Sequence, residues 1–354
     1  MFKYIYALFF LSLVFTSCSD RSKDNLQPSV GKLGSLVVVS TPEVHAALSS
    51  NLDSVFLKEV VHLPGGEPFF ELLKPSPDEF FKFFSNQKSV LVLVTEQNKN
   101  DMSDLLEGFS DKDINAFIKD PLPVIKDQRD VFARYQHLVY LFGRNDEDLK
   151  RKLQLCEERL NMALLDFEIK DQHDKLFGAP TENDHFYQDI KKELGLGVKI
   201  PSQFVLKEHK DGFWWFEYNS TEGETPKTIA LLAHQYAYSD TSAFTYTAIR
   251  TVRDSVLKYH IKGEIKGTYM GTSESDAYPP RFINAFKVND MRGTKVRGWW
   301  NMEGLIMGGP FIRYVIPIPG TKNVFAFEGF VYKPNLNTKE KDLRLIESIA
   351  LSIH

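Results

Sequence analysis

The sequence SVLVLVTE, residues 89–96, decides how the first half of this 354-residue chain folds. Its five consecutive aliphatic residues show no alternation with polar residues, which predicts a strand buried on both faces of its sheet. Such a strand needs helices on both sides. Upstream, Ser76-Pro77-Asp78-Glu79 has the pattern of a capping box with proline at the first helical position, and it opens a phenylalanine-rich helix. Downstream, one or two helices are expected in residues 101–119, ended by Pro121 and Pro123.

The same succession of strand and helix extends on either side. LVVVS (36–40) and LVYLFG (138–143) predict further strands, and Thr41-Pro42-Glu43 and Asn145 have the residue types that begin helices. The helix that begins at Asn145 carries its apolar residues on one stripe, and Cys156 lies in that stripe, so we expect a core residue rather than a reactive thiol. Residues 35–177 are therefore predicted to form an N-terminal α/β domain, either layered or of the split ferredoxin-like kind.

The second half follows a different pattern. Residues 199–218 read as a hairpin that turns at Asp211-Gly212, and more strands, a helix after Asp240 or Thr241 and a closing helix after Asn337 follow. We expect an antiparallel sheet covered by helices over residues 199–354, preceded by a linker at 178–198. The fold class is thus α+β with two domains. In element order alone, the C-terminal half resembles the PsbP or Mog1 type of α/β/α sandwich.

The first residues have the features of an export signal. Lys3 is followed by an uncharged apolar run, residues 4–15, that is too short to span a bilayer. Phe15-Thr16-Ser17-Cys18 resembles the lipobox of bacterial lipoproteins, in which the cysteine is acylated and becomes the first residue. The resemblance implies a signal peptide at 1–17, a lipidated Cys18 in the membrane and a flexible tether at 18–34. The alternative is ordinary secretion with cleavage near Ser19.

Composition limits the classes of partner. The chain has 43 Lys and Arg against 47 Asp and Glu, a balance that argues against nucleic acid, which requires a basic face. It has two cysteines, so lipidation of Cys18 would leave Cys156 without a disulfide partner and without a cysteine-based metal spacing. No cofactor is expected.

The densest group of chemically useful residues is RGWWNMEGLIMGGPF, residues 297–311. Trp299 and Trp300, flanked by Arg297 and Glu303, could form a stacking platform for a sugar or an aromatic ligand, and Trp215 in FWWF (213–216) could contribute to it. The alternative is a turn region whose tryptophans fill the core.

Other motifs are weaker. His173-Asp174 and Asp184-His185 lack the spacing of known zinc sites and are expected to belong to a solvated linker, so no metal site is predicted. No nucleophile elbow or phosphate-binding glycine loop is present, and no catalytic residue is assigned.

As a whole, the chain resembles an uncharacterised family of bacterial envelope lipoproteins. The residues that carry this resemblance are the lipobox at Cys18 and the segments 67–70, 136–140 and 297–311. It implies a lipid-anchored protein of the cell envelope, and Ser19 favours the outer membrane, facing the periplasm. We expect a non-catalytic module that binds an envelope protein or a glycan. The alternative is an envelope hydrolase that uses Glu303 with another ionisable residue.

Overall fold

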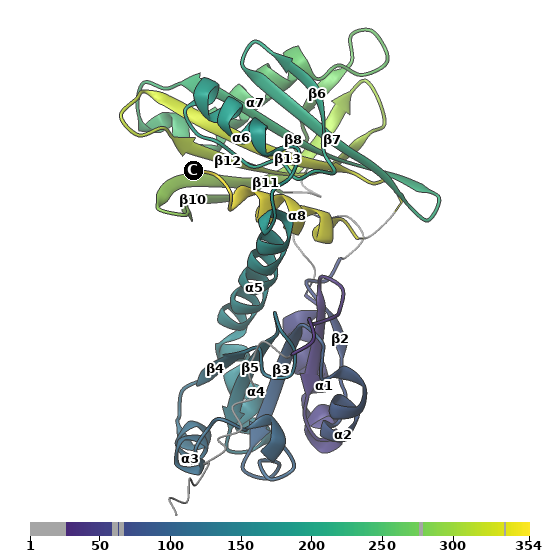
Figure 1. The fold of residues 1–354 in the computed structure, drawn as a ribbon, viewed down its shortest axis with the longest axis vertical. Helices are drawn as coiled ribbons and strands as arrows, with labels where there is room; N and C mark the ends of the chain where they lie inside the picture. The colour runs from purple at the N-terminus through teal and green to yellow at the C-terminus, as the bar shows by residue number, and fades with distance from the viewer. Residues whose placement is uncertain (1–25, 59–62, 64–66, 276–278, 336–337) are drawn as a thin grey trace, which may run out of the picture.

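The computed structural model describes residues 26–58, 63, 67–275, 279–335 and 338–354. It shows two domains stacked end to end and joined by the long helix α5 (Glu157–Phe177), which runs from the first domain to α8 (Lys339–Ala350) of the second (Figure 1). The predicted α+β class with two domains is confirmed. The lipobox and Cys18 lie outside the described residues.

The N-terminal domain is built on a five-stranded sheet with the order β2-β1-β3-β5-β4. Its strands are β1 (Ser35–Val39), β2 (Glu71–Leu73), β3 (Ser89–Thr95), β4 (Ile125–Arg129) and β5 (His137–Gly143). The first, second, third and fifth are parallel, and β4 runs antiparallel to β5 at the edge. Every residue of β3 and β5 is buried, as the unbroken apolar runs predict.

Helices cover both faces of this sheet. Besides α5, the helical elements of this domain are α1 (Pro42–Phe56), α2 (Pro77–Glu79), η2 (Phe80–Phe84), η3 (Ser103–Leu105), α3 (Asp111–Lys119) and α4 (Asp146–Leu155). One face packs on α1, α4 and the start of α5, and the other packs on η2, η3 and α3. The capping box at Ser76 and Glu79 is formed as predicted. Cys156 is a buried free thiol in the first of these cores, and burial raises its pKa to about 11.

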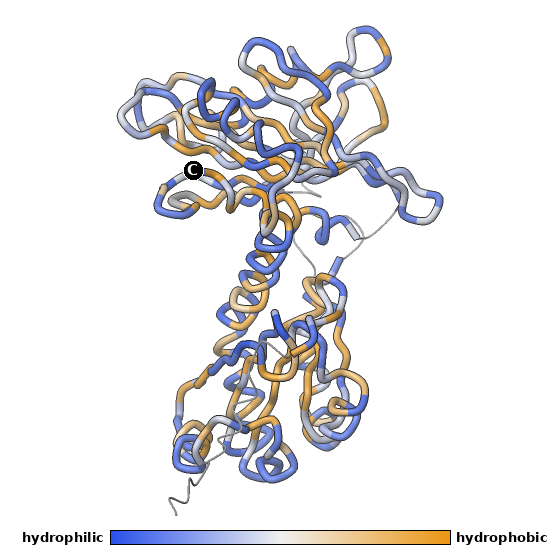
Figure 2. Tube along the Cα trace, viewed as in Figure 1, coloured by the Kyte–Doolittle hydropathy of each residue, from blue (hydrophilic) through white to orange (hydrophobic). Residues whose placement is uncertain are grey.

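The C-terminal domain contains an antiparallel sheet with the order β10-β11-β12-β13-β8-β7-β6, and β9 also pairs with β11. Its strands are β6 (Val205–Lys210), β7 (Phe213–Glu222), β8 (Thr225–Ala237), β9 (Tyr269–Thr272), β10 (Arg281–Val288), β11 (Met291–Glu303), β12 (Gly308–Pro317) and β13 (Asn323–Tyr332). Figure 2 shows hydrophobic residues along the strands of both domains and polar residues in most loops.

Helices also cover both faces of the second sheet. One face packs on α7 (Tyr246–His260), which follows the 3₁₀ turn η4 (Thr241–Phe244), and the other packs on α6 (Asp184–Leu194) and α8. The predicted linker at 178–198 therefore contains a helix of this domain, because Ile190 and Leu194 of α6 are fully buried in its core.

The predicted tether is described from Leu26 onward, and there it lies on the N-terminal domain. The amide of Ser29 donates to Arg134 O at 2.8 Å, the amide of Val30 donates to Asn86 O at 2.8 Å, and isolated bridges join Pro28 to Arg134 and Val30 to Gln87. Residues 26–34 are thus part of the folded domain rather than a free coil.

Buried charged groups join the two domains around α8. Arg344 Nη1 lies 2.6 Å from Glu168 Oε2 of α5, and both side chains are only 1% exposed. Glu168 also accepts the Gly34 amide, and Arg344 donates to Phe69 O. Glu67 accepts the Glu340 amide at 2.8 Å and so caps the start of α8 from the other domain.

Candidate functional site

The five residues expected to bind a ligand do not share a surface. Arg297 is mostly buried and pairs with Glu347 Oε2 at 2.9 Å and with Glu340 Oε2 at 3.3 Å, both on α8. Burial alone would raise the pKa of Glu347, but the charges of Arg297 and Lys295 outweigh it and lower this pKa to about 2. Arg297 therefore holds α8 on the sheet.

Strand alternation separates the tryptophans. Trp299 packs on the α8 face, whereas Trp300 and Trp215 pack on the α7 face. Trp300 is 1% exposed and donates from Nε1 to Val331 O, which is the core role that the alternative interpretation of this segment describes. Glu303 is exposed at the end of β11 and accepts a hydrogen bond from Asn301. Within the described part of the chain, no ionisable group forms an ion pair with Glu303.

The crevice that usually binds ligands in open α/β sheets is filled. It lies outside the carboxyl ends of neighbouring strands where the order reverses, which is between β1 and β3 here. The Asn98 amide donates to Ser40 Oγ at 3.0 Å across that end, and Ser40, Thr95 and Asn98 are at most 3% exposed. A ligand cannot enter there without breaking these hydrogen bonds.

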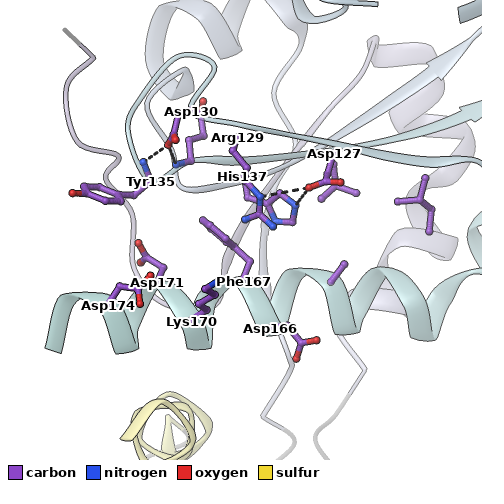
Figure 3. Close-up of a pocket in the computed structure, with 14 residues that line it drawn as sticks. Asp127, Arg129, Asp130, Tyr135, His137, Asp166, Phe167, Lys170, Asp171 and Asp174 are labelled. Atoms are coloured by element: carbon purple, nitrogen blue, oxygen red, sulfur yellow. Dashed lines mark hydrogen bonds and ion pairs between the residues drawn. The ribbon is translucent and has the colours of Figure 1, made fainter. Parts of the chain in front are cut away.

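An open pocket of about 670 Å³ lies toward the opposite end, between β4, the start of β5 and α5 (Figure 3). We call it the β4–α5 pocket. Its lining comes from β4 and β5 with the loop between them (Ile125, Asp127, Arg129, Asp130, Tyr135, Gln136, His137, Val139) and from α5 (Ala163, Asp166, Phe167, Lys170, Asp171, Asp174). Its volume is in the range of small-molecule sites.

His137 is the central residue of this pocket. It is 1% exposed, and neither ring nitrogen has a hydrogen-bond partner in the described structure. Nε2 lies 3.5 Å from Asp127 Oδ2, which is too long for a good hydrogen bond. Burial, assisted by the charge of Arg129, lowers the pKa of His137 to about 4 against the opposing effect of Asp127. The ring is therefore neutral at pH 7, and its two nitrogens are left buried without a hydrogen-bond partner.

Neighbouring groups fix the orientation of His137. The ring centre of Phe167 lies 4.7 Å from that of His137, and the guanidinium carbon of Arg129 lies 4.4 Å from the Phe167 ring centre. Arg129 Nε in turn lies 3.5 Å from Asp127 Oδ2. The wall of the pocket is thus a stack of rings and a guanidinium with one carboxylate at its side.

A strained loop forms one end of the pocket. Asp130 and Tyr135 have φ of 55° and 61°, values that non-glycine residues rarely adopt. Asp130 Oδ1 accepts the Tyr135 amide, and the buried side chain of Gln136 donates to Ser85 O and Gln87 O, so the loop is firmly held. Tyr135 is nevertheless 51% exposed. Strain of this kind is concentrated at binding and catalytic sites.

Helix α5 supplies the remaining polar groups. Asp171 is buried and bound by Lys88 Nζ at 2.5 Å and Lys175 Nζ at 3.1 Å. Lys170 and Asp174 are exposed, and they make no hydrogen bond or ion pair within the residues that the structure describes. They are therefore available to a ligand.

No part of this pocket was expected from sequence as a site. The segment 136–140 carries part of the family resemblance, and its first two residues are Gln136 and His137. A polar pair at the point where a fully buried strand begins is the one local signal of this pocket in the sequence.

Among the described residues, no group of three or more His, Cys, Asp or Glu side chains is arranged so that it could hold a metal ion. His173 lies on α5 and binds Ser348 O across the domain joint, whereas His185 lies on α6. In the same part of the chain, no helix is long and apolar enough to span a bilayer.

Solved structures show only weak similarity. Each of three covers 45% of this chain: the Ran-binding protein Mog1p of Saccharomyces cerevisiae (9% identity, 89% of that chain, TM-score 0.31), a protein of Bacteroides thetaiotaomicron VPI-5482 (11%, 44%, 0.24) and LpqN of Mycobacterium tuberculosis, a protein involved in cell envelope biogenesis (12%, 81%, 0.27). The similarity to Mog1 suggested by element order is thus present but too weak to support any statement about function. No curated protein matches the chain.

Family models match both domains. Residues 29–177 match a domain of unknown function (DUF8532), and residues 183–352 match another (DUF4837). The chain therefore consists of two consecutive segments, each similar to a family of domains of unknown function, and together they cover nearly its full length.

Proposed function

We propose that this protein is a non-catalytic binding module of the bacterial cell envelope, held through a lipidated Cys18 at the outer membrane on its periplasmic side. Its β4–α5 pocket binds the partner, an envelope protein or a glycan. The observation that carries the binding role is His137, a fully buried side chain with two unsatisfied nitrogens on the wall of an open pocket. The resemblance of residues 15–18 to a lipobox supports the anchor.

Catalysis is not part of this proposal. Glu303 lies exposed at the end of β11, outside the lining of the β4–α5 pocket, and its side chain accepts a hydrogen bond from Asn301. In the β4–α5 pocket, Asp127 pairs with Arg129, and the guanidinium of Arg129 lies over Phe167, so these side chains form a fixed wall.

The proposal is tested by capture of envelope material on the purified, detergent-solubilised protein, with separate analysis of bound polypeptide and bound carbohydrate. His137→Gln should remove the captured species. His45→Gln, a change to a histidine that binds Pro75 O outside the pocket, should not. Equal capture by both variants would refute the role of the pocket.

The anchor is tested independently by fractionation and by mass spectrometry of the mature amino terminus. Cys18→Ala should release the protein from membranes. An unmodified terminus in the wild type would refute lipidation and leave the pocket unaffected.

A further inference from the structure

We propose that the ligand of the β4–α5 pocket is a neutral, hydroxyl-rich saccharide that stacks on Tyr135 and forms hydrogen bonds with Lys170 and Asp174, above the buried His137. This inference rests on the proposed binding role of the pocket and adds the chemical class of the ligand. Charge balance, hydrogen-bonding capacity and an exposed ring support it.

Charges in the pocket are largely compensated within the protein. Asp127 is paired with Arg129, and Asp171 is paired with Lys88 and Lys175. Asp166 points away from the sheet (Figure 3), and burial and the charge of Glu347 raise its pKa. Asp130 accepts the amides of Tyr135 and Gln136. With Lys88 and Lys175 included, the five aspartates of the lining face four basic side chains, so the pocket offers little net charge to attract an ion.

The polar atoms of the pocket match hydroxyl groups. Lys170 presents donors and Asp174 presents acceptors at the surface of the pocket, whereas the nitrogens of His137 lie beneath that surface. A sugar hydroxyl both donates and accepts, so vicinal hydroxyls can satisfy both exposed side chains without burying an unpaired charge.

An aromatic platform is also present. Tyr135 keeps half of its surface exposed, although its backbone is strained by φ of 61° and fixed by Asp130. The ammonium of Lys175, which is bound to Asp171, lies over this ring 5.8 Å from its centre, and the guanidinium carbon of Arg134 lies over it at 6.0 Å, so a sugar stacks on the part of the ring that these cations leave exposed. A ring that stays exposed although its backbone is strained is suited to stacking on the apolar face of a sugar.

A protein partner fits this lining less well. Protein interfaces depend on a desolvated apolar pocket for an anchoring side chain. In the β4–α5 pocket, apolar surface comes from Ile125, Val139 and Ala163 and from the rings of Tyr135 and Phe167, and charged side chains interrupt it. A sugar ring, which has apolar faces and hydroxyl groups at its edge, matches this mixture better than a single apolar anchor does.

The test is titration calorimetry of the full mature protein in detergent at pH 7 with maltotriose, cellotriose, N,N′,N″-triacetylchitotriose and mannotriose, and with one acidic and one basic hexapeptide. We expect at least one neutral trisaccharide to bind. Tyr135→Ala should weaken that binding at least tenfold, and Tyr135→Phe should retain it. Tyr259→Ala removes a tyrosine that is 57% exposed in the other domain and should have no effect.

The possible failures are distinguishable. Binding of a peptide, but of no neutral trisaccharide, with loss in His137→Gln would overturn the ligand class and leave the pocket's role intact. If none of the saccharides and peptides gives a binding signal, the saccharide inference is wrong. Saccharide binding that is unchanged in Tyr135→Ala and His137→Gln, both folded by circular dichroism, would overturn both proposals.

Discussion

Arg344→Met should destabilise the protein strongly, because it leaves Glu168 charged and buried at the domain joint. Both side chains are 1% exposed and lie 2.6 Å apart. Burial already raises the pKa of Glu168, against the effects of Arg344 and the Gly34 amide. Breaking a buried ion pair by removing one member costs about 3–5 kcal/mol. Loss of the hydrogen bond from Arg344 to Phe69 O should lower the free energy of unfolding further.

Two further variants separate the contribution of the Arg344–Glu168 ion pair to stability from the effects of neighbouring groups. Glu168→Leu with Arg344→Met removes both charges, so most of the cost should disappear and the double variant should be far more stable than Arg344→Met alone. Lys341→Met is the matched control, since Lys341 lies on the same helix and is partly exposed, and it pairs at 2.9 Å with the exposed Glu71. Its expected cost is about 0–1 kcal/mol.

Urea unfolding provides the assay. All four tryptophans lie in the C-terminal domain, so their fluorescence reports that domain and circular dichroism reports both. A cost for Arg344→Met as small as that for Lys341→Met would show that the pair does not stabilise the joint.

Three other predictions concern individual residues. His137 has a pKa of about 4 in the folded protein against an ordinary 6.5, so between these pH values the unfolded state binds one more proton than the folded state. The free energy of unfolding should therefore fall by about 3 kcal/mol at most as the pH drops from 6.5 to 4. In His137→Phe, the urea concentration at the midpoint of unfolding should depend less on pH over this range. Glu347 has a lowered pKa of about 2, so its contribution is present above pH 4.5 and is lost below it; Glu347→Gln should lower the fluorescence midpoint at pH 7 and reduce its decline between pH 4.5 and 2. Gly309→Ala would place a Cβ 1.9 Å from Val331 O, so it should lower the free energy of unfolding by about 1–3 kcal/mol, measured by the same fluorescence transition. A change below about 0.5 kcal/mol would show that β12 and β13 move apart readily to make room for the methyl group.

The fold class could be predicted because the strongest signals in the sequence are local. The unbroken apolar run at 89–95 and the capping box at Ser76 each depend on residues that are adjacent in the chain, and both are present in the structure. Edge strand β4 was missed because IKDQR is half exposed and carries no apolar alternation. Helix α6 was missed because its apolar residues are few, although Ile190 and Leu194 have helical spacing.

The site could not be predicted in the same way, because its members meet only through tertiary packing. His137 follows a polar loop and begins an apolar strand, and its partner Phe167 lies 30 positions later on α5. The proposed tryptophan platform shows the opposite error: proximity in sequence does not mean proximity on a surface. The alternation that separates Trp214 from Trp215 separates Trp299 from Trp300 as well.

The docking of residues 26–34 has a mechanical meaning. A pull on the chain ahead of Leu26 does not reach β1 directly, because the hydrogen bonds of Ser29 and Val30 with Arg134 and Asn86 carry the load first. Arg134 is the immediate neighbour of Tyr135, so tension is transmitted to the mouth of the pocket before it reaches any strand of the sheet.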